Sequence, residues 1–205
     1  KKGFLLVDSG ATYMDGTTDI TRTYPLGPLT EDEKRFYTWT LQSHIDLAKA
    51  VWLDYCECKM IDTIAREPLW RHLINYRCGT GHSVSFVGNV HEGPHALNGR
   101  NTTLMRPGMV VTDEPGVYET DLVGIRIENE LVCVHRADNQ YGTFLGFEPL
   151  MFVPIATSPI LPGVLDKDEI AWLNDYHRQV FAKLAPHLND EERSWLAEKC
   201  AAIGC

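Results

Sequence analysis

The chain has 205 residues, a hydrophobic fraction of 44% and a formal net charge of −9. This length is sufficient for one sizeable domain with its own core. No apolar run approaches the ~18 residues that a membrane span needs, and the sequence has no dense Lys/Arg stripe, so the composition argues against a membrane protein and against nucleic acid as a partner.

The first predicted element is a β-hairpin. Residues 3–7 form an apolar run, residues 20–24 alternate between apolar and polar side chains, and Asp15-Gly16 between them is a turn signal. Asp8 is placed where the first strand stops and Asp19 where the return strand begins, so the hairpin would bring them close together. Two such carboxylates repel each other unless they are protonated, hydrogen-bonded or bound to a cation. Ordinary loop aspartates are the alternative interpretation.

Helices and further strands follow along the chain. Thr30 and Glu33 match a capping box, and apolar side chains at roughly helical spacing predict a helix over 31–51, followed by a second helix over 59–71. Strands are predicted at 108–112, 124–135 and 150–154, and one or two amphipathic helices at 166–202. A single α+β domain over 1–205 is the economical interpretation.

A glycine-rich segment, CGTGHSVSFVGNVHEGPH, carries His82, His91 and His95. A lone histidine is usually a surface residue or a satisfied core residue. Three within fourteen residues, interspersed with glycines, weaken that interpretation, because glycines let the backbone approach a ligand or another strand closely.

Two glutamates lie in the strands that follow. Glu114 comes directly after the apolar residues 109–111, and Glu128 is predicted in mid-strand. A period of two places Arg126, Glu128 and Glu130 on one face. Glu128 and Arg126 can form a simple surface ion pair, or a metal ligand supported by an arginine; the sequence alone leaves both open.

These acidic residues and one histidine fit a single metal site. Two aspartates, one histidine and two glutamates are too many ligands for one zinc ion with an open position. They suit a pair of divalent ions bridged by carboxylates, about 3.5–4 Å apart. Four oxygen ligands and one nitrogen ligand favour harder ions such as Mn²⁺, although Co²⁺, Fe²⁺ and Zn²⁺ can also bind.

The chain resembles the catalytic domain of the pita-bread metallopeptidases, of the cytosolic aminopeptidase P (Xaa-Pro aminopeptidase) type. The resemblance extends over nearly the whole chain, and its motifs are DSGATYMDGTTDITRT, GTGH, NVHEGP, TDEPGVYE, GIRIEN and GFEPL. NVHEGP favours aminopeptidase P over prolidase or methionine aminopeptidase. The resemblance implies a pita-bread fold and a cytoplasmic, dinuclear metallo-aminopeptidase that releases the N-terminal residue from peptides with proline in the second position.

The same resemblance implies a role for each site residue. It implies metal ligation by Asp8, Asp19, His82, Glu114 and Glu128. Asp19 and Glu128 would bridge the two divalent ions, with Mn²⁺ the first expectation. Catalytic roles fall to His91, Glu114 and Arg126, and substrate contacts to His91, Tyr118 and Cys78. Asp15 would only make the turn, and His95 would be incidental.

Two features depart from the family pattern. Cys78 stands four residues before His82, where the family usually has a histidine, and Ser83 and Ser85 stand where glycines are common. The family's catalytic domain begins well upstream of Lys1, so we expect the C-terminal portion of such a domain, with the N-terminal part missing.

Two alternatives remain open, and both share the fold. One is a prolidase-like enzyme acting on Xaa-Pro dipeptides, and the other is a non-catalytic binding protein. Peptides with penultimate proline are the expected partners, and a homodimer is neither indicated nor excluded. Cys56 and Cys58 are one residue apart, which does not fit CxxC motifs, so we expect the six cysteines to be free thiols in a reducing cytosol.

Overall fold

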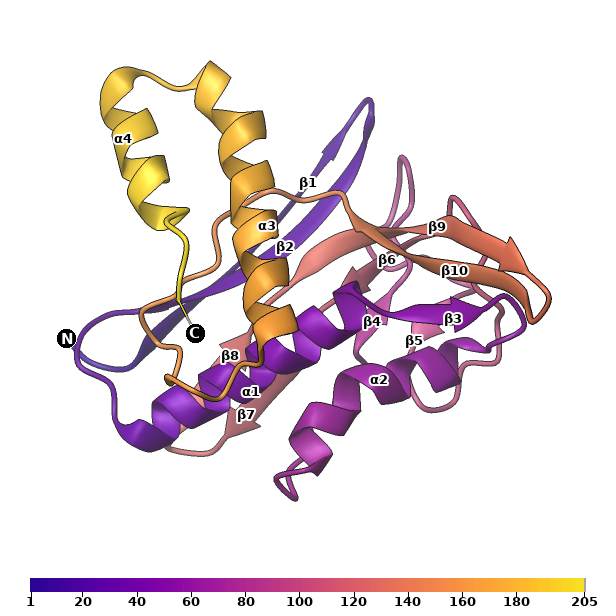
Figure 1. Cartoon of the computed structure of the whole chain (residues 1–205), viewed down its shortest axis with the longest axis horizontal. Coiled ribbons are helices and arrows are strands. Elements are labelled where there is room, and N and C mark those ends of the chain that lie inside the picture. Colours follow the sequence, from indigo (N-terminus) through magenta and orange to yellow (C-terminus); the bar gives the residue numbers. More distant parts are fainter. Residues whose placement is uncertain (205) are drawn as a thin grey trace.

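A computed structural model describes residues 1–204 and shows an α+β architecture (Figure 1). Every strand pair in this part of the chain is antiparallel. In chain order the elements are β1 (Phe4–Tyr13), β2 (Gly16–Pro25), α1 (Glu31–Ala48), β3 (Val51–Leu53), α2 (Cys58–Trp70), β4 (Gly81–His82), β5 (Ala96–Leu97), β6 (Val110–Asp113), β7 (Gly116–Glu119), β8 (Val123–Arg126), β9 (Asn129–Asn139), β10 (Gly142–Pro149), α3 (Lys167–Leu184), a short 3₁₀ helix (Ala185–His187) and α4 (Asp190–Lys199).

The predicted hairpin is present but longer than expected. β1 and β2 pair from Phe4–Pro25 to Tyr13–Gly16, and the hairpin extends as a long arm in Figure 1. The prediction that Asp8 ends the first strand and Asp19 begins the second is therefore wrong, since both lie within strands. The alternation of apolar and polar residues did not predict this extension. Residues 8–13 of β1 are exposed and carry small or polar side chains, so they show no such alternation.

The helix predictions hold, with shifted ends. The capping box is confirmed: the Glu33 amide donates to Thr30 Oγ1 at 3.2 Å, and the Thr30 amide donates to the Glu33 carboxylate at 2.6 Å. α1 ends at Ala48 instead of residue 51, because Val51–Leu53 forms strand β3 beside β10. The C-terminal segment forms two helices, α3 and α4. Among residues 1–204, no helix combines the length and apolar character needed to cross a membrane.

Two strand predictions are wrong. The segment 150–154 is irregular, and the strand lies before it as β10. Pro154 in this segment has no amide donor. The backbone of Val153 is instead bonded by side chains: Arg22 donates to the Val153 carbonyl at 2.8 Å, and the Val153 amide donates to the Tyr176 hydroxyl at 3.2 Å. The predicted strand 124–135 is two strands, β8 and β9, and Glu128 lies at the break between them instead of in mid-strand.

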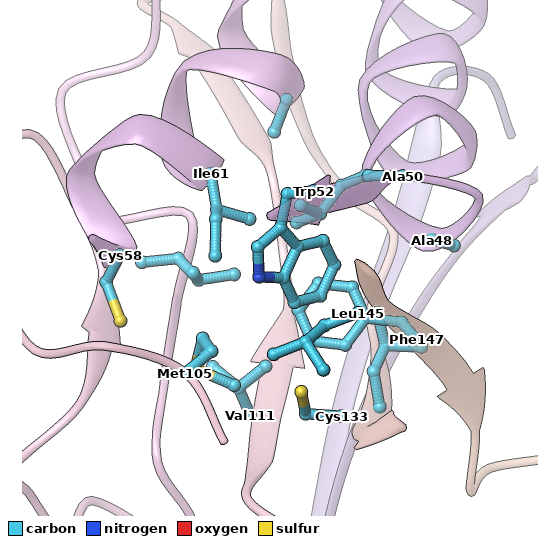
Figure 2. Packing of buried hydrophobic residues seen from close by; sticks show 14 residues of the cluster. Ala48, Ala50, Trp52, Cys58, Ile61, Met105, Val111, Cys133, Leu145 and Phe147 are labelled. Carbon is cyan, nitrogen blue, oxygen red and sulfur yellow. The ribbon is translucent and has the colours of Figure 1, made fainter. Parts of the chain in front are cut away.

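The core consists of two main clusters, which meet at α1 and Trp172. The first lies between α2 and the four-stranded sheet β3-β10-β9-β6, and Figure 2 shows Trp52 beside Ile61, Leu145 and Phe147. The second packs α1 against α3 and β8, with Tyr176 fully buried. Helices α1 and α2 therefore pack against the strands that adjoin the acidic residues.

Candidate metal centre

Six acidic and histidine side chains converge although they come from different elements. Their ligand atoms form three overlapping groups, and within each group all the ligand atoms lie within 4.8 Å of one another. The groups are Asp19 with His82 and His91, His82 with Glu114 and Glu128, and Asp8 with Asp19 and Glu128. The structure thus brings together all five predicted ligands and adds His91 beside them.

The hairpin supplies the two aspartates. Asp8 pairs with Thr21 and Gly10 pairs with Asp19. Asp19 is 9% exposed, whereas the Asp8 side chain is about half exposed. The Asp8 carboxylate therefore lies at the mouth of the cluster, and Asp19 lies inside it.

His82 is held by close backbone packing. A Cβ atom at Gly81 would lie 1.7 Å from the Thr112 carbonyl oxygen, so only glycine fits directly before this histidine. The His82 amide donates to Thr112 Oγ1 at 2.9 Å, and Nδ1 lies 3.1 Å from the Ser83 carbonyl. Because a carbonyl only accepts, Nδ1 carries a proton, and Nε2 is directed at the carboxylates.

Nearby carboxylates dominate the electrostatics of His82. Its Nε2 atom lies 3.1 Å from Glu114 Oε1 and 3.5 Å from Asp19 Oδ2. Burial lowers the pKa of His82, but the hydrogen bonds with Asp19 and Glu114 outweigh this effect and raise the pKa to about 10. The site therefore favours a positive charge at this position.

Glu128 is the most deeply buried carboxylate of the cluster, at 1% exposure. Its backbone amide donates to the Thr21 carbonyl at 3.1 Å, and its carboxylate accepts the Thr21 hydroxyl at 2.5 Å. Burial, together with the nearby charge of Glu114, raises the pKa of Glu128 to about 8, although the Thr21 hydrogen bond lowers it. Carboxylates packed this closely fit divalent cations, whose charge relieves their repulsion.

Arg126 spans the mouth of the cluster. It contacts Asp8 Oδ2 at 2.5 Å, donates to the Tyr118 hydroxyl at 2.6 Å, and approaches Glu128 Oε2 at 3.9 Å. Burial lowers the pKa of Arg126, but the Tyr118 hydroxyl and the acidic neighbours raise the pKa by more than burial lowers it, so the guanidinium stays charged. Tyr118 is half exposed and thus lies at the entrance.

The remaining predicted residues lie at different distances from the metal-capable cluster. The ring of His91 packs on that of His82 with centroids 3.9 Å apart. Cys78 belongs to none of the three metal-capable groups of the described residues, and its thiol lies 3.7 Å from the Gly116 carbonyl. Burial, and then the charge of Glu114, raises the pKa of this thiol. His95 is not brought to the cluster; its Nε2 atom donates to the Val110 carbonyl at 2.7 Å.

The sequence analysis did not identify the residues that position the ligands. Thr21 holds Glu128, and Thr112 donates to Glu114 Oε1 at 3.0 Å. Asp62 on α2 accepts the Thr80 hydroxyl, which anchors the segment before His82. Thr21 could have been found, because it is in phase with Asp19 in the period-two pattern of TTDITRT.

Comparison with known proteins identifies the class that this fold and site define. The family model described as metallopeptidase family M24 matches residues 1–135, and a model of the C-terminal region of peptidase M24 matches residues 143–203. The chain belongs to metallopeptidase family M24, as its motifs predicted.

The relatives found extend this result. Aminopeptidase P1 of Lotus japonicus is 43% identical, over 97% of this chain and 31% of that protein, and aminopeptidase P2 of Arabidopsis thaliana is 44% identical, over 93% and 28%. An X-prolyl aminopeptidase of Caenorhabditis elegans, described as a cytosolic enzyme with a di-nuclear active site, superimposes with a TM-score of 0.92 at 39% identity, over 98% of this chain and 34% of that chain.

A more distant structural relative is the prolidase of Pyrococcus furiosus. It gives a TM-score of 0.62 at 28% identity, over 73% of this chain and 42% of that chain. These likenesses confirm the predicted pita-bread fold. The chain spans about a third of the length of the two plant aminopeptidases and of the C. elegans enzyme.

Proposed function

We propose that this protein is a dinuclear metallo-aminopeptidase that releases the N-terminal residue from peptides with proline in the second position. The observation that carries the proposal is the convergence of four carboxylates and one imidazole from separate segments of the chain. The names of its relatives, aminopeptidase P and X-prolyl aminopeptidase, support the substrate class.

The donor set supports two divalent ions, with Mn²⁺ as the proposed metal. Asp19, His82 and Glu128 each belong to two of the three overlapping groups. Of these three, the carboxylates of Asp19 and Glu128 have two oxygens with which to bridge two ions, whereas His82 directs one ring nitrogen at the cluster, and this supports the two carboxylates as bridging ligands. The terminal ligands would be Asp8, His82 and Glu114. When bound, the metal pair would supply Lewis-acid activation of water and of the scissile carbonyl.

Glu114 and His91 are the proposed proton-transfer residues. The Glu114 carboxylate accepts the Thr112 hydroxyl and lies beside His82, so it is oriented to take a proton from the attacking water. His91 is exposed at the rim beside His82. The nitrogen of a proline leaving group has no N–H and must gain a proton, which His91 can deliver there or to the developing oxyanion.

Arg126, Tyr118 and Cys78 complete the proposed site. Arg126 orients the Asp8 carboxylate and the Tyr118 hydroxyl, and the latter would contact substrate at the entrance. Cys78 would line the substrate side close to Gly116. A cytoplasmic location is proposed with this function, and the cytosolic relative from C. elegans supports it.

The test combines metal analysis with peptide hydrolysis on the intact protein. Asp19→Ala and Glu128→Ala should each lose bound Mn²⁺ and activity on an Xaa-Pro-Xaa tripeptide. Asp15→Ala is the matched control, because Asp15 is an exposed residue of the same hairpin and should keep both. Full occupancy of both metal sites in Asp19→Ala or in Glu128→Ala would contradict the assignment of these two residues as ligands. Cleavage of an Xaa-Pro dipeptide but not of the tripeptide would show a prolidase instead.

A further inference from the structure

Helix α2 carries a buried ion pair whose members belong to none of the metal-capable groups of residues 1–204. Arg66 Nε donates to Asp62 Oδ2 at 2.8 Å. Asp62 is 1% exposed and Arg66 is 9% exposed. Charges that are removed from water in this way cost free energy unless further hydrogen bonds satisfy their remaining donors and acceptors. The other partners of these two side chains therefore indicate the role of the pair.

Arg66 directs further N–H groups at the segment that leads to His82. Nη1 donates to the Tyr76 carbonyl at 2.8 Å, and Nη2 donates to the Cys78 carbonyl at 2.9 Å. The guanidinium also lies over the Tyr76 ring, with Cζ 4.1 Å from the ring centroid. A planar guanidinium holds several acceptors in one fixed geometry, which a lysine ammonium group cannot do. Arg66 thus fixes this segment against α2.

The Asp62 carboxylate holds the next part of the same segment through the Thr80 hydroxyl. This hydroxyl donates to Asp62 Oδ1, and its oxygen lies 2.5 Å from the Tyr76 hydroxyl. Because the single proton of the Thr80 hydroxyl goes to the carboxylate, the Tyr76 hydroxyl is the donor in the second contact. Thr80 is fully buried, so its hydroxyl is enclosed between these two partners.

The backbone of Thr80 connects this network to two of the proposed metal ligands. The Thr80 carbonyl accepts the Glu114 amide at 2.7 Å. His82 follows two residues later, across Gly81, where a Cβ atom would lie 1.7 Å from a backbone oxygen. A displacement of Thr80 would therefore be passed on to both ligands. Distances between a metal ion and its ligands are fixed to about 0.2 Å, so even a small displacement would weaken binding.

We propose that the Asp62–Arg66 pair positions the metal centre, acting through Thr80 on His82 and Glu114. The inference rests on the proposed function, because it takes these last two residues as metal ligands. Asp62 and Arg66 would not contact metal or substrate themselves. Residues that orient the ligands of a metal site typically change metal affinity by about tenfold to a hundredfold when they are removed.

Calorimetric titration of Mn²⁺ into the intact, metal-free protein measures this effect without relying on activity. Thr80→Val keeps the shape of the side chain but removes the hydroxyl, and it should weaken Mn²⁺ binding roughly tenfold or more. Thr80→Ser, which keeps the hydroxyl, should bind Mn²⁺ as the parent protein does. Arg66→Lys should also weaken Mn²⁺ binding, because lysine cannot hold the carbonyls of residues 76 and 78 at the same time.

Two controls on α2 separate positioning from a general loss of stability, which Thr80→Val should also cause by leaving buried polar partners unpaired. Glu67→Gln removes an exposed ion pair with Arg71, and it should change neither Mn²⁺ affinity nor urea unfolding. Ile61→Val removes one methylene group from the core, and it should lower the urea midpoint but leave the Mn²⁺ affinity of the folded protein unchanged.

The possible results distinguish this inference from the proposed function. Parent-like Mn²⁺ affinity in Thr80→Val or in Arg66→Lys would overturn the inference. An equal loss of affinity in Ile61→Val would overturn it as well, because the effect would then follow stability alone. A parent protein that binds Mn²⁺ but does not cleave an Xaa-Pro-Xaa tripeptide would contradict only the proposed peptidase activity, whereas a parent protein that binds no Mn²⁺ would overturn both.

Discussion

Removal of divalent metal should make the stability of this protein depend strongly on pH. Glu128 should contribute a large part of this dependence, beside Glu130 and Asp113, whose pKa values burial raises to about 7 and about 6. The pKa of the Glu128 carboxyl is raised from its ordinary value of 4.5 to about 8 in the folded state. Between these two values the folded protein keeps a proton that the unfolded chain has lost. The free energy of unfolding should therefore be highest below about pH 4.5 as far as Glu128 is concerned, and should fall as the pH rises through about 8.

The expected size of this effect follows from the same two values. At about 1.4 kcal/mol per pH unit, the interval from 4.5 to about 8 corresponds to a loss on the order of 5 kcal/mol, a large part of a typical folding free energy. His82 acts in the same direction. Its pKa is raised from 6.5 to about 10, so the stability it contributes is complete below pH 6.5 and is lost as the pH rises through about 10.

Urea unfolding in EDTA at several values between about pH 5 and pH 9 would measure this dependence. Glu128→Gln should make the profile less steep, because the amide does not ionise, and Glu148→Gln should leave it unchanged, because the Glu148 side chain is 58% exposed. Added Mn²⁺ should restore stability at pH 8 to 9 in the parent protein. A metal-free profile equally steep in Glu128→Gln and the parent would refute this explanation.

Three further predictions concern other residues. Cys78→His and Cys78→Ala should both keep full metal content by elemental analysis. The kcat/KM on a tripeptide should be kept or improved in Cys78→His and modestly changed in Cys78→Ala. Loss of metal in Cys78→Ala would make the thiol a ligand. His91→Ala should lower kcat/KM roughly a hundredfold or more, because a proton-transfer group is lost, whereas a change in KM alone would indicate a purely binding role. Tyr176→Phe should lower the free energy of unfolding by about 1–3 kcal/mol, because the Tyr176 hydroxyl is buried and accepts a hydrogen bond from Arg22 at 2.9 Å. Tyr141→Phe is the control, because Tyr141 is exposed. Equal unfolding curves for Tyr176→Phe and the parent protein would contradict a stabilising role of this hydroxyl.

The elements that were predicted correctly depend on local signals. The capping box at Thr30 and Glu33 and the alternation of residues 20–24 each act within a few residues, so the sequence alone contains them. Motif order also identified the residues that converge at the site. The roles assigned to those residues stay predictions until metal content and activity are measured.

The errors arose where distant side chains decide the backbone. Residues 150–154 have the apolar composition of a strand, but Arg22 and Tyr176 bind the backbone of Val153 from β2 and α3. The strand break at Glu128 has a similar cause, because its amide donates to Thr21 on the hairpin. The donors and acceptors involved lie more than a hundred residues apart in some pairs, and no local pattern records them.

The neighbouring residues Thr21 and Arg22 connect the metal centre to the C-terminal part of the chain. Thr21 donates to the Glu128 carboxylate, while Arg22 donates to the Glu128 backbone carbonyl and to the Tyr176 hydroxyl on α3. The position of Glu128 therefore depends on how α3 packs, although α3 contributes no side chain to the metal-capable groups of residues 1–204. Since binding energy at such a site is also folding energy, a change that loosens α3 should weaken metal affinity, and bound metal should in turn stabilise the packing of α3.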